Sequence, residues 1–295
     1  MKAYFQLLRP HQYFKNLLLY LPAFFALRIT EQAVFLRVTL AVLGFSLVAS
    51  AVYILNDYLD READALHPTK KHRPLASGVI SGRNGLILMV VLLLVGIPGF
   101  WKLSPTAFYL VSGYVFMNVL YTFRLKHIPI LDIFVIALGF LIRISVGAMV
   151  AKPFIPLSMW IELMIFLGAL FLALAKRRDD VLLAADGKKV RKSISGYNLE
   201  FINGAMMIMA SVLIVSYISY TISPEVQDKL GSDQLYLTVF FVLLGVLRYM
   251  QITLVEENSG SPTKIFLKDR FLQFTIIGWI LTFGWLIYDW SVLIR

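Results

Sequence analysis

The sequence contains no cysteine and few charged residues. The absence of cysteine excludes disulfides and metal sites built on thiolates. Charged residues make up 16% of the 295 residues and hydrophobic residues 59%. Soluble proteins average about 25% charged and about 45–50% apolar residues. This composition predicts an integral membrane protein.

Several signatures of catalysis are also missing. There is no glycine-rich nucleotide loop, no HExxH motif and no Ser-His-Asp arrangement that stands out. The four histidines lie near predicted membrane boundaries and lack the spacing of metal ligands. The N-terminal arm, MKAYFQLLRPHQYFKN, lacks the pattern of a cleavable signal peptide, so we expect the first apolar segment to remain in the membrane.

Nine apolar stretches are present, most of them near the ~20 residues that a membrane-spanning helix needs. We expect an all-α membrane protein in which nine transmembrane helices form a single domain over residues 1–295. The first stretch is the weakest because it is short and contains Pro22. The stretches lie near residues 14–29, 34–55, 84–101, 106–123, 128–150, 155–175, 202–222, 235–255 and 271–293.

The net charge of +10 is explained by membrane topology, and we expect no nucleic-acid partner. Lysine and arginine gather in the N-terminal arm and in the loops after the second, fourth, sixth and eighth stretches. The positive-inside rule therefore places the N-terminus in the cytoplasm. The two long polar segments, residues 56–83 and 176–201, are predicted on the same side.

The first polar segment opens with a group of acidic residues. If the preceding helix continues, Asp57, Asp60 and Asp64 project from one face. An ordinary solvated helix end is the alternative, but the helix dipole disfavours negative charge there. Oxygen ligands without histidine or cysteine favour Mg²⁺, which often binds carboxylates together with substrate phosphates. Asn56 precedes the group and is expected to support it.

A basic run follows the acidic group. Lys70 and Arg73 belong to it, and the planar fork of an arginine can bind a phosphate through two hydrogen bonds. The alternative is that these cations serve topology or bind anionic lipid. Together, the acidic and basic groups predict a site for Mg²⁺ and a diphosphate.

Polar residues at the membrane boundary or within it are further candidates. Lys15 lies where the first stretch begins, and snorkelling to the interface is its alternative role. Tyr121 and Lys126 lie at the exit of the fourth stretch. Arg143 lies in the middle of an apolar stretch, about three helical turns after Asp132, so both are expected on one face lining a cavity.

The second polar segment is rich in cations. Its candidate phosphate ligands are Lys176, Arg177, Arg191 and Lys192. The excess of cations over acids in this segment suits a polyanionic ligand. A solvated loop that determines topology is the alternative.

The segment NDYLDREADALHPTKKHRP resembles the first aspartate-rich motif of the intramembrane UbiA prenyltransferase superfamily. RPHQYFKN near the N-terminus also matches, and the resemblance covers almost the whole chain. It implies nine transmembrane helices around a cytoplasm-facing cavity. Members that use prenyl diphosphates carry a second DxxxD motif, but KRRDDVLLAADG has Leu183 and Ala184 where the second aspartate would stand.

KRRDD, RKSISGYN and LKHIPILDIF instead resemble the decaprenyl-phosphate phosphoribosyltransferase branch. This resemblance implies transfer of phosphoribose from phosphoribosyl pyrophosphate to a polyprenyl phosphate, giving decaprenylphosphoryl-5-phosphoribose for cell-wall arabinan. It implies that Asp57, Asp60 and Asp64 hold Mg²⁺. The donor phosphates would be surrounded by Lys15, Arg73, Lys176 and Arg177, with Arg191 and Lys192 on the 5-phosphate. The cavity would be lined by Tyr121, Lys126 and Arg143.

We therefore predict a phosphoribosyltransferase in a bacterial inner membrane, with the active site facing the cytoplasm. One alternative is a prenyltransferase that joins a polyprenyl diphosphate to an aromatic acceptor. A transporter or lipid flippase and a non-catalytic scaffold are further alternatives. The sequence leaves homo-oligomerisation open.

Overall fold

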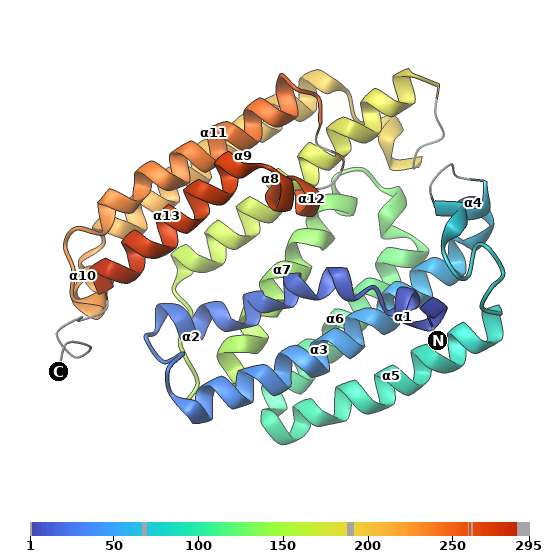
Figure 1. Ribbon diagram of the computed structural model, residues 1–295, viewed down its shortest axis with the longest axis horizontal. Helices are drawn as coiled ribbons and strands as arrows, with labels where there is room; N and C mark the ends of the chain where they lie inside the picture. The colour runs from blue at the N-terminus through green and yellow to red at the C-terminus, as the bar shows by residue number, and fades with distance from the viewer. Residues whose placement is uncertain (1, 67–69, 188–191, 259, 261, 288–295) are drawn as a thin grey trace. The chain divides into compact units, whose positions relative to one another are not determined.

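A computed structural model describes residues 2–66, 70–187, 192–258, 260 and 262–287. This part of the chain is helical and contains no strand (Figure 1). The chain divides into two compact units, residues 1–157 and 158–295, which are described separately. The prediction of a single domain remains a prediction.

Unit 1 is built around one long apolar helix, α3 (Gln32–Leu59), which packs against α5 (Gly82–Leu103) and α6 (Pro105–Phe123). Figure 1 shows α3 and α5 running side by side. The remaining elements are α1 (Lys2–Leu8), η1 (Pro10–Tyr20), α2 (Leu21–Phe25), α4 (Arg61–Ala65), η2 (Lys70–His72), η3 (Leu125–His127) and α7 (Leu131–Val150), where η marks a 3₁₀ helix.

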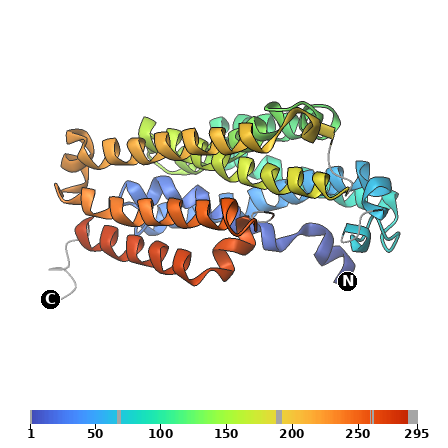
Figure 2. The same ribbon diagram turned by 90° about the horizontal axis from the view of Figure 1, so that it is seen from above.

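Unit 2 consists mainly of four long helices. In Figures 1 and 2, α11 (Val239–Leu254, orange) and α13 (Arg270–Ile287, red) lie side by side. The helix α8 (Met159–Ala185) packs against α9 (Leu199–Ile222), whose N-terminus is capped by the Asn198 side chain. The shorter elements are η4 (Lys192–Gly196), α10 (Pro224–Leu230), η5 (Leu235–Thr238) and α12 (Pro262–Lys268).

Eight helices in the described part of the chain are long and apolar enough to span a membrane. They correspond to the second to ninth stretches predicted from the sequence. The first stretch differs, because it forms the 3₁₀ helix η1 followed by the short helix α2. Proline stands in the first turn of each, where its missing N–H is tolerated, so a new segment begins at each proline. The predicted count of nine is therefore not confirmed.

Close helix packing positions the first stretch within unit 1. A Cβ added at Gly147 of α7 would lie 2.1 Å from the carbonyl oxygen of Leu19, so only glycine permits this approach. Arg37 of α3 donates to the carbonyl oxygens of Val150 and Leu103, at the ends of α7 and α5. These bonds satisfy acceptors that a helix C-terminus leaves unpaired.

The end of α3 is the element that positions the acidic group. A helix that continues through Asp64 with the three aspartates on one face is not what the structure shows: α3 ends at Leu59, and Asp60 has φ −88° and ψ 0° before α4 begins at Arg61. Aspartate favours such a helix end because its side chain competes for backbone hydrogen bonds. Asp57 therefore lies on α3, Asp60 at the break and Asp64 on α4.

Candidate active site

Two buried carboxylates share one guanidinium group. Nη1 of Arg73 lies 3.0 Å from Oδ1 of Asp57 and 2.6 Å from Oδ2 of Asp64. The two aspartates are only 2% and 5% exposed. Burying a charged carboxylate is costly unless an opposite charge and hydrogen bonds compensate for the lost water. Arg73, which the sequence predicts as a phosphate ligand, supplies that charge here.

Arg9 is a second partner of Asp57, and the sequence reasoning did not single it out. Its Nη2 lies 2.5 Å from Oδ1 of Asp57, and its guanidinium lies 5.4 Å from the ring centroid of Tyr53. Arg9 has a φ of 53°, a left-handed conformation that is uncommon for a residue other than glycine. The RPHQYFKN motif contains Arg9, but in the sequence it was only one of several cations that indicate topology.

Asp60 is held by a different set of partners. Nζ of Lys126, on η3, lies 2.6 Å from Oδ1 of Asp60, and Nδ2 of Asn56 donates to Oδ2 at 3.0 Å. Lys126 is only 7% exposed. The structure thus brings Asn56 and Lys126 to the acidic group, although the sequence placed Lys126 only on the wall of a cavity. Lys70 lies at its edge, with Nζ 4.0 Å from Oδ1 of Asp64.

The acidic group fits a divalent cation in its chemistry. The carboxylates of Asp57 and Asp64 converge on one positively charged nitrogen, and carboxylate oxygens are the ligands that Mg²⁺ prefers. Within residues 2–66, 70–187, 192–258, 260 and 262–287, no three acidic, histidine or cysteine side chains form a ready metal cluster. Instead, Asp57 and Asp64 both form ion pairs with Arg73, and Asp60 forms an ion pair with Lys126.

Arg143 lies inside unit 1 and is almost completely buried, at 5% exposure. Its partners in the described chain are the Oδ1 atom of Asn16 at 3.0 Å, the carbonyl oxygen of Gly139 at 2.6 Å and the hydroxyl of Tyr114 at 3.1 Å. The face of the Phe45 ring lies 5.0 Å from the guanidinium carbon. These neutral partners leave the positive charge of Arg143 without a neutralising carboxylate among the described hydrogen-bond partners.

Lys15 adds a second cation beside this group. Its ammonium feels the positive charges of both Arg143 and Arg9, and no described carboxylate forms an ion pair with it. Cations that repel one another are stabilised by a shared anion. Tyr121 is half-buried in the last turn of α6, and Asp132 is fully buried in the first turn of α7.

Comparison with known proteins shows the family of this chain. The sequence profile described as the UbiA prenyltransferase family matches residues 17–277. The chain belongs to this family. A decaprenyl-phosphate phosphoribosyltransferase of Mycolicibacterium smegmatis is 33% identical over 291 residues, covering 95% of this chain and 91% of the relative. A Corynebacterium glutamicum protein of the same name is 32% identical, over 92% of this chain and 83% of the relative.

The fold of this UbiA family member is also that of a solved structure. A UbiA homologue from Archaeoglobus fulgidus bound to DMAPP and Mg²⁺ matches with a TM-score of 0.71 and 18% identity. The match covers 97% of this chain and 99% of the homologue. Because eight helices among its described residues are long and apolar enough to span a membrane, this UbiA family member is a multi-pass membrane protein.

The second polar segment of this UbiA protein belongs to unit 2. Arg177 is 1% exposed, and its Nη1 lies 2.6 Å from Oδ2 of Asp180. Lys176 is half-buried beside it on α8. Arg191 and the side chain of Lys192 lie outside the described residues, so their predicted role has no structural counterpart here.

Arg178 was not among the predicted site residues, although it is the most firmly held of this segment. Its Nη1 donates to the carbonyl oxygen of Thr253 at 2.7 Å and its Nε to Oδ1 of Asn203 at 3.1 Å. An ion pair with Glu257 is longer, at 3.3 Å. Arg178 therefore connects α8 with α9 and the end of α11. No pattern in the local sequence distinguishes it from Arg177.

Proposed function

We propose that this protein transfers phosphoribose from phosphoribosyl pyrophosphate to decaprenyl phosphate, giving decaprenylphosphoryl-5-phosphoribose and pyrophosphate. The observation that carries the proposal is the buried carboxylate pair on Arg73, flanked by Arg9 and Lys126. Such a group suits a donor that combines a metal ion with a diphosphate. The names of full-length relatives at about one-third identity support the same activity.

Asp57, Asp60 and Asp64 are proposed to hold Mg²⁺. When bound, the ion would neutralise charge on the pyrophosphate as it leaves. The carboxylates would then no longer need Arg9, Arg73 and Lys126 as their counter-charges. Because Arg9 and Arg73 are 19% and 28% exposed in their side chains, they can turn toward donor phosphate oxygens. Asn56 would keep Asp60 oriented.

The remaining cations are proposed to bind phosphate groups. Lys15 and Arg143 carry positive charge that no described ion pair neutralises, which suits a donor phosphate. Tyr121 is proposed to line the substrate cavity together with Lys126 and Arg143. The donor phosphates and the 5-phosphate are assigned, as proposals, to Lys70, Lys176, Arg177, Arg191 and Lys192.

The reaction needs positioning more than acid–base chemistry. An oxygen of the acceptor phosphate forms a bond to C1 of the ribose, and the C1–O bond to pyrophosphate breaks with its electron pair leaving on pyrophosphate. The acceptor phosphate is already anionic at neutral pH, so no strong general base is required. The cationic side chains stabilise the charge that develops on the leaving group. In-line displacement inverts the configuration at C1.

We also propose that the protein lies in a bacterial inner membrane with its N-terminus and active site on the cytoplasmic side. The distribution of lysine and arginine supports this orientation. Phosphoribosyl pyrophosphate is a highly charged, water-soluble donor, so a cytoplasmic site suits it. The product would supply arabinan synthesis for the cell wall.

A lipid-extraction assay tests the activity. Purified protein is incubated with Mg²⁺, decaprenyl phosphate and phosphoribosyl pyrophosphate labelled in the ribose. We expect label to enter the organic phase and to stay in water when a chelator is added. A parallel reaction contains labelled polyprenyl diphosphate and 4-hydroxybenzoate. Prenylation of the aromatic acid, without phosphoribose transfer by folded protein, would replace our proposal with the prenyltransferase alternative.

A further inference from the structure

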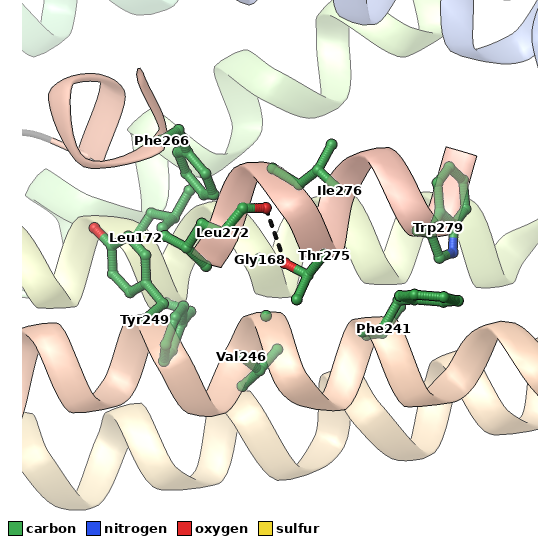
Figure 3. Close-up of a pocket in the computed structure, with 13 residues that line it drawn as sticks. Gly168, Leu172, Phe241, Val246, Tyr249, Phe266, Leu272, Thr275, Ile276 and Trp279 are labelled. Carbon is green, nitrogen blue, oxygen red and sulfur yellow. Dashed lines mark hydrogen bonds between the residues drawn. The ribbon is translucent and has the colours of Figure 1, made fainter. Parts of the chain in front are cut away.

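Unit 2 contains a cavity of about 290 Å³ that the proposed chemistry does not use. Its walls come from α8, α11, α12 and α13 (Figure 3). The cavity lies among apolar helices that can span the membrane. Apolar cavities of this kind stay dry and accept apolar ligands.

The walls are mainly aromatic and aliphatic. Five of the 13 lining residues are aromatic: Phe171, Phe241, Tyr249, Phe266 and Trp279. Aromatic faces carry partial negative charge, which favours contact with the C–H edges of a branched hydrocarbon. The lining therefore suits an apolar chain better than a polar molecule.

One polar group on the walls lacks a partner. The hydroxyl of Tyr249 is buried and makes no hydrogen bond with any described residue, and the whole side chain is only 2% exposed. Figure 3 shows that the hydroxyl of Thr275, by contrast, donates to the carbonyl oxygen of Leu272. The indole N–H of Trp279 donates to the hydroxyl of Tyr217. An unpaired buried hydroxyl is costly, so a ligand oxygen beside Tyr249 would be stabilising.

Two glycines keep the cavity open. A Cβ added at Gly245 of α11 would meet only the Thr275 hydroxyl, at 3.7 Å, and one added at Gly168 of α8 would meet only Leu213, at 3.3 Å. Gly245 itself lines the cavity, so a larger side chain there would take up cavity space. Substitution there fills the space without a clash at the first carbon.

The dimensions match a short piece of lipid chain. Tyr249 and Phe241 lie at opposite ends of the cavity (Figure 3) and are about 12 Å apart along the axis of α11 at 1.5 Å per residue. If each non-hydrogen atom takes about the 30 Å³ of a water molecule, the cavity holds roughly ten of them. Ten carbons make two isoprene units. The Tyr249 end is the one nearer the C-terminal end of α11 at Leu254.

We propose that this cavity binds the first isoprene units of a polyprenyl phosphate, with the Tyr249 hydroxyl donating to an oxygen at the head end of the lipid. The chain would run from Tyr249 toward Phe241 and Trp279. This assignment rests on the proposed function only in naming the isoprenoid as the acceptor. It adds a lipid-binding site to the unit that lacks the aspartate pair.

Binding without donor tests the site. Full-length protein in nanodiscs is titrated with decaprenyl phosphate, and retained lipid is measured by native mass spectrometry. We expect Gly245→Phe to weaken binding at least tenfold, whereas Gly245→Ala changes it less than twofold. Tyr249→Phe should weaken binding about threefold and leave the melting temperature unchanged or raised, because an unpaired hydroxyl is removed. Gly284→Phe is the matched control, since its added Cβ would meet open space and it does not line the cavity.

Unchanged binding in folded Gly245→Phe protein would overturn the assignment. The assignment would also be overturned if dioleoyl phosphatidylglycerol displaced bound decaprenyl phosphate as effectively as unlabelled decaprenyl phosphate does, because the cavity would then accept any lipid chain. The lipid-binding site and the proposed reaction can fail independently of each other. If Gly245→Phe loses the lipid but the wild-type protein transfers no phosphoribose, the proposed reaction fails and the site stands. If transfer occurs and Gly245→Phe keeps the wild-type KM for decaprenyl phosphate, the site fails alone.

Discussion

The two charged regions of this protein are built in opposite ways. At the carboxylate pair of unit 1 the acids are buried and the cation is more exposed, since the side chains of Asp57 and Asp64 are 3% and 6% exposed and that of Arg73 is 28% exposed. In unit 2 the cations are buried, since the side chain of Arg178 is 6% exposed and that of its partner Glu257 is 56% exposed. A cation that can leave buried carboxylates suits the metal site proposed for unit 1. A cation held by backbone oxygen strengthens the fold.

Replacing a buried carboxylate should have the largest effect. Asp64→Asn is expected to lower phosphoribose transfer by about a thousandfold, equivalent to about 4 kcal/mol of transition-state stabilisation. The reason is that an amide is a poor ligand for Mg²⁺ and no longer orients Arg73. Transfer is measured by lipid extraction. Glu62→Gln on the same short helix is the control, since the Glu62 side chain is 87% exposed, and equal losses in both variants would contradict the metal role.

Arg178→Gln should show the opposite behaviour. We expect a loss of about 2 kcal/mol in the free energy of unfolding, because the carbonyl of Thr253 and the amide of Asn203 lose their partner. Transfer per folded molecule should change less than threefold. Denaturant titration in detergent measures stability, and rate assays on the folded fraction measure transfer. A stable but inactive variant would show that the two regions share a catalytic role.

Arg73→Gln should separate metal binding from donor binding. Without the guanidinium, Asp57 and Asp64 lose their competing cation, so Mn²⁺ is expected to bind severalfold more tightly in the absence of donor. The KM for phosphoribosyl pyrophosphate should rise about tenfold, because a phosphate ligand is lost. Electron paramagnetic resonance of free Mn²⁺ measures the first effect. Weaker Mn²⁺ binding in this variant would mean that Arg73 orients the carboxylates and does not compete with the ion.

The half-buried pair of Arg248 and Asp269 should give the smallest effect. Arg248 lies 2.7 Å from Oδ2 of Asp269 and holds the pKa of that carboxyl below its usual value. Since the folded pKa is the lower one, the stabilisation is complete above the unfolded pKa of about 3.9 and is lost as the pH falls through the folded pKa. Asp269→Asn should lower the free energy of unfolding at pH 7 by less than about 1 kcal/mol. Melting temperatures of both proteins between pH 7 and pH 3 should converge at the acid end, and a constant difference would contradict the pair's role.

The membrane helices could be predicted from the sequence because hydropathy is a local property. Eight of the nine apolar stretches correspond to helices that can span a membrane. The first could not be predicted in detail, because hydropathy does not distinguish the 3₁₀ form of η1 from an α-helix. Similarly, the break at Asp60 was not predicted, because no helix-ending glycine or proline marks it in the sequence.

The aspartate group was predicted, but its partners were predicted only in part. Arg73 and Lys126 were named as site residues from their charge and position. Arg9 was missed because 48 positions separate it from Asp57, and one cation among several in an N-terminal arm carries no local signal. Arg178 was missed for the same reason, since its contacts to Asn203 and Thr253 are 25 and 75 positions away.

The sequence by itself determined the membrane class, the order of the apolar segments and the acidic motif that resembles the UbiA superfamily. These features depend on composition and short spacing, which the chain carries wherever it folds. Only the tertiary structure decided that Asp57 and Asp64 converge on one guanidinium while Asp60 pairs with Lys126, 66 positions away. It also decided that a cavity opens beside Tyr249. The meeting of distant side chains and the cavity between helices both arise from helix packing, so the sequence of a single segment cannot reveal them.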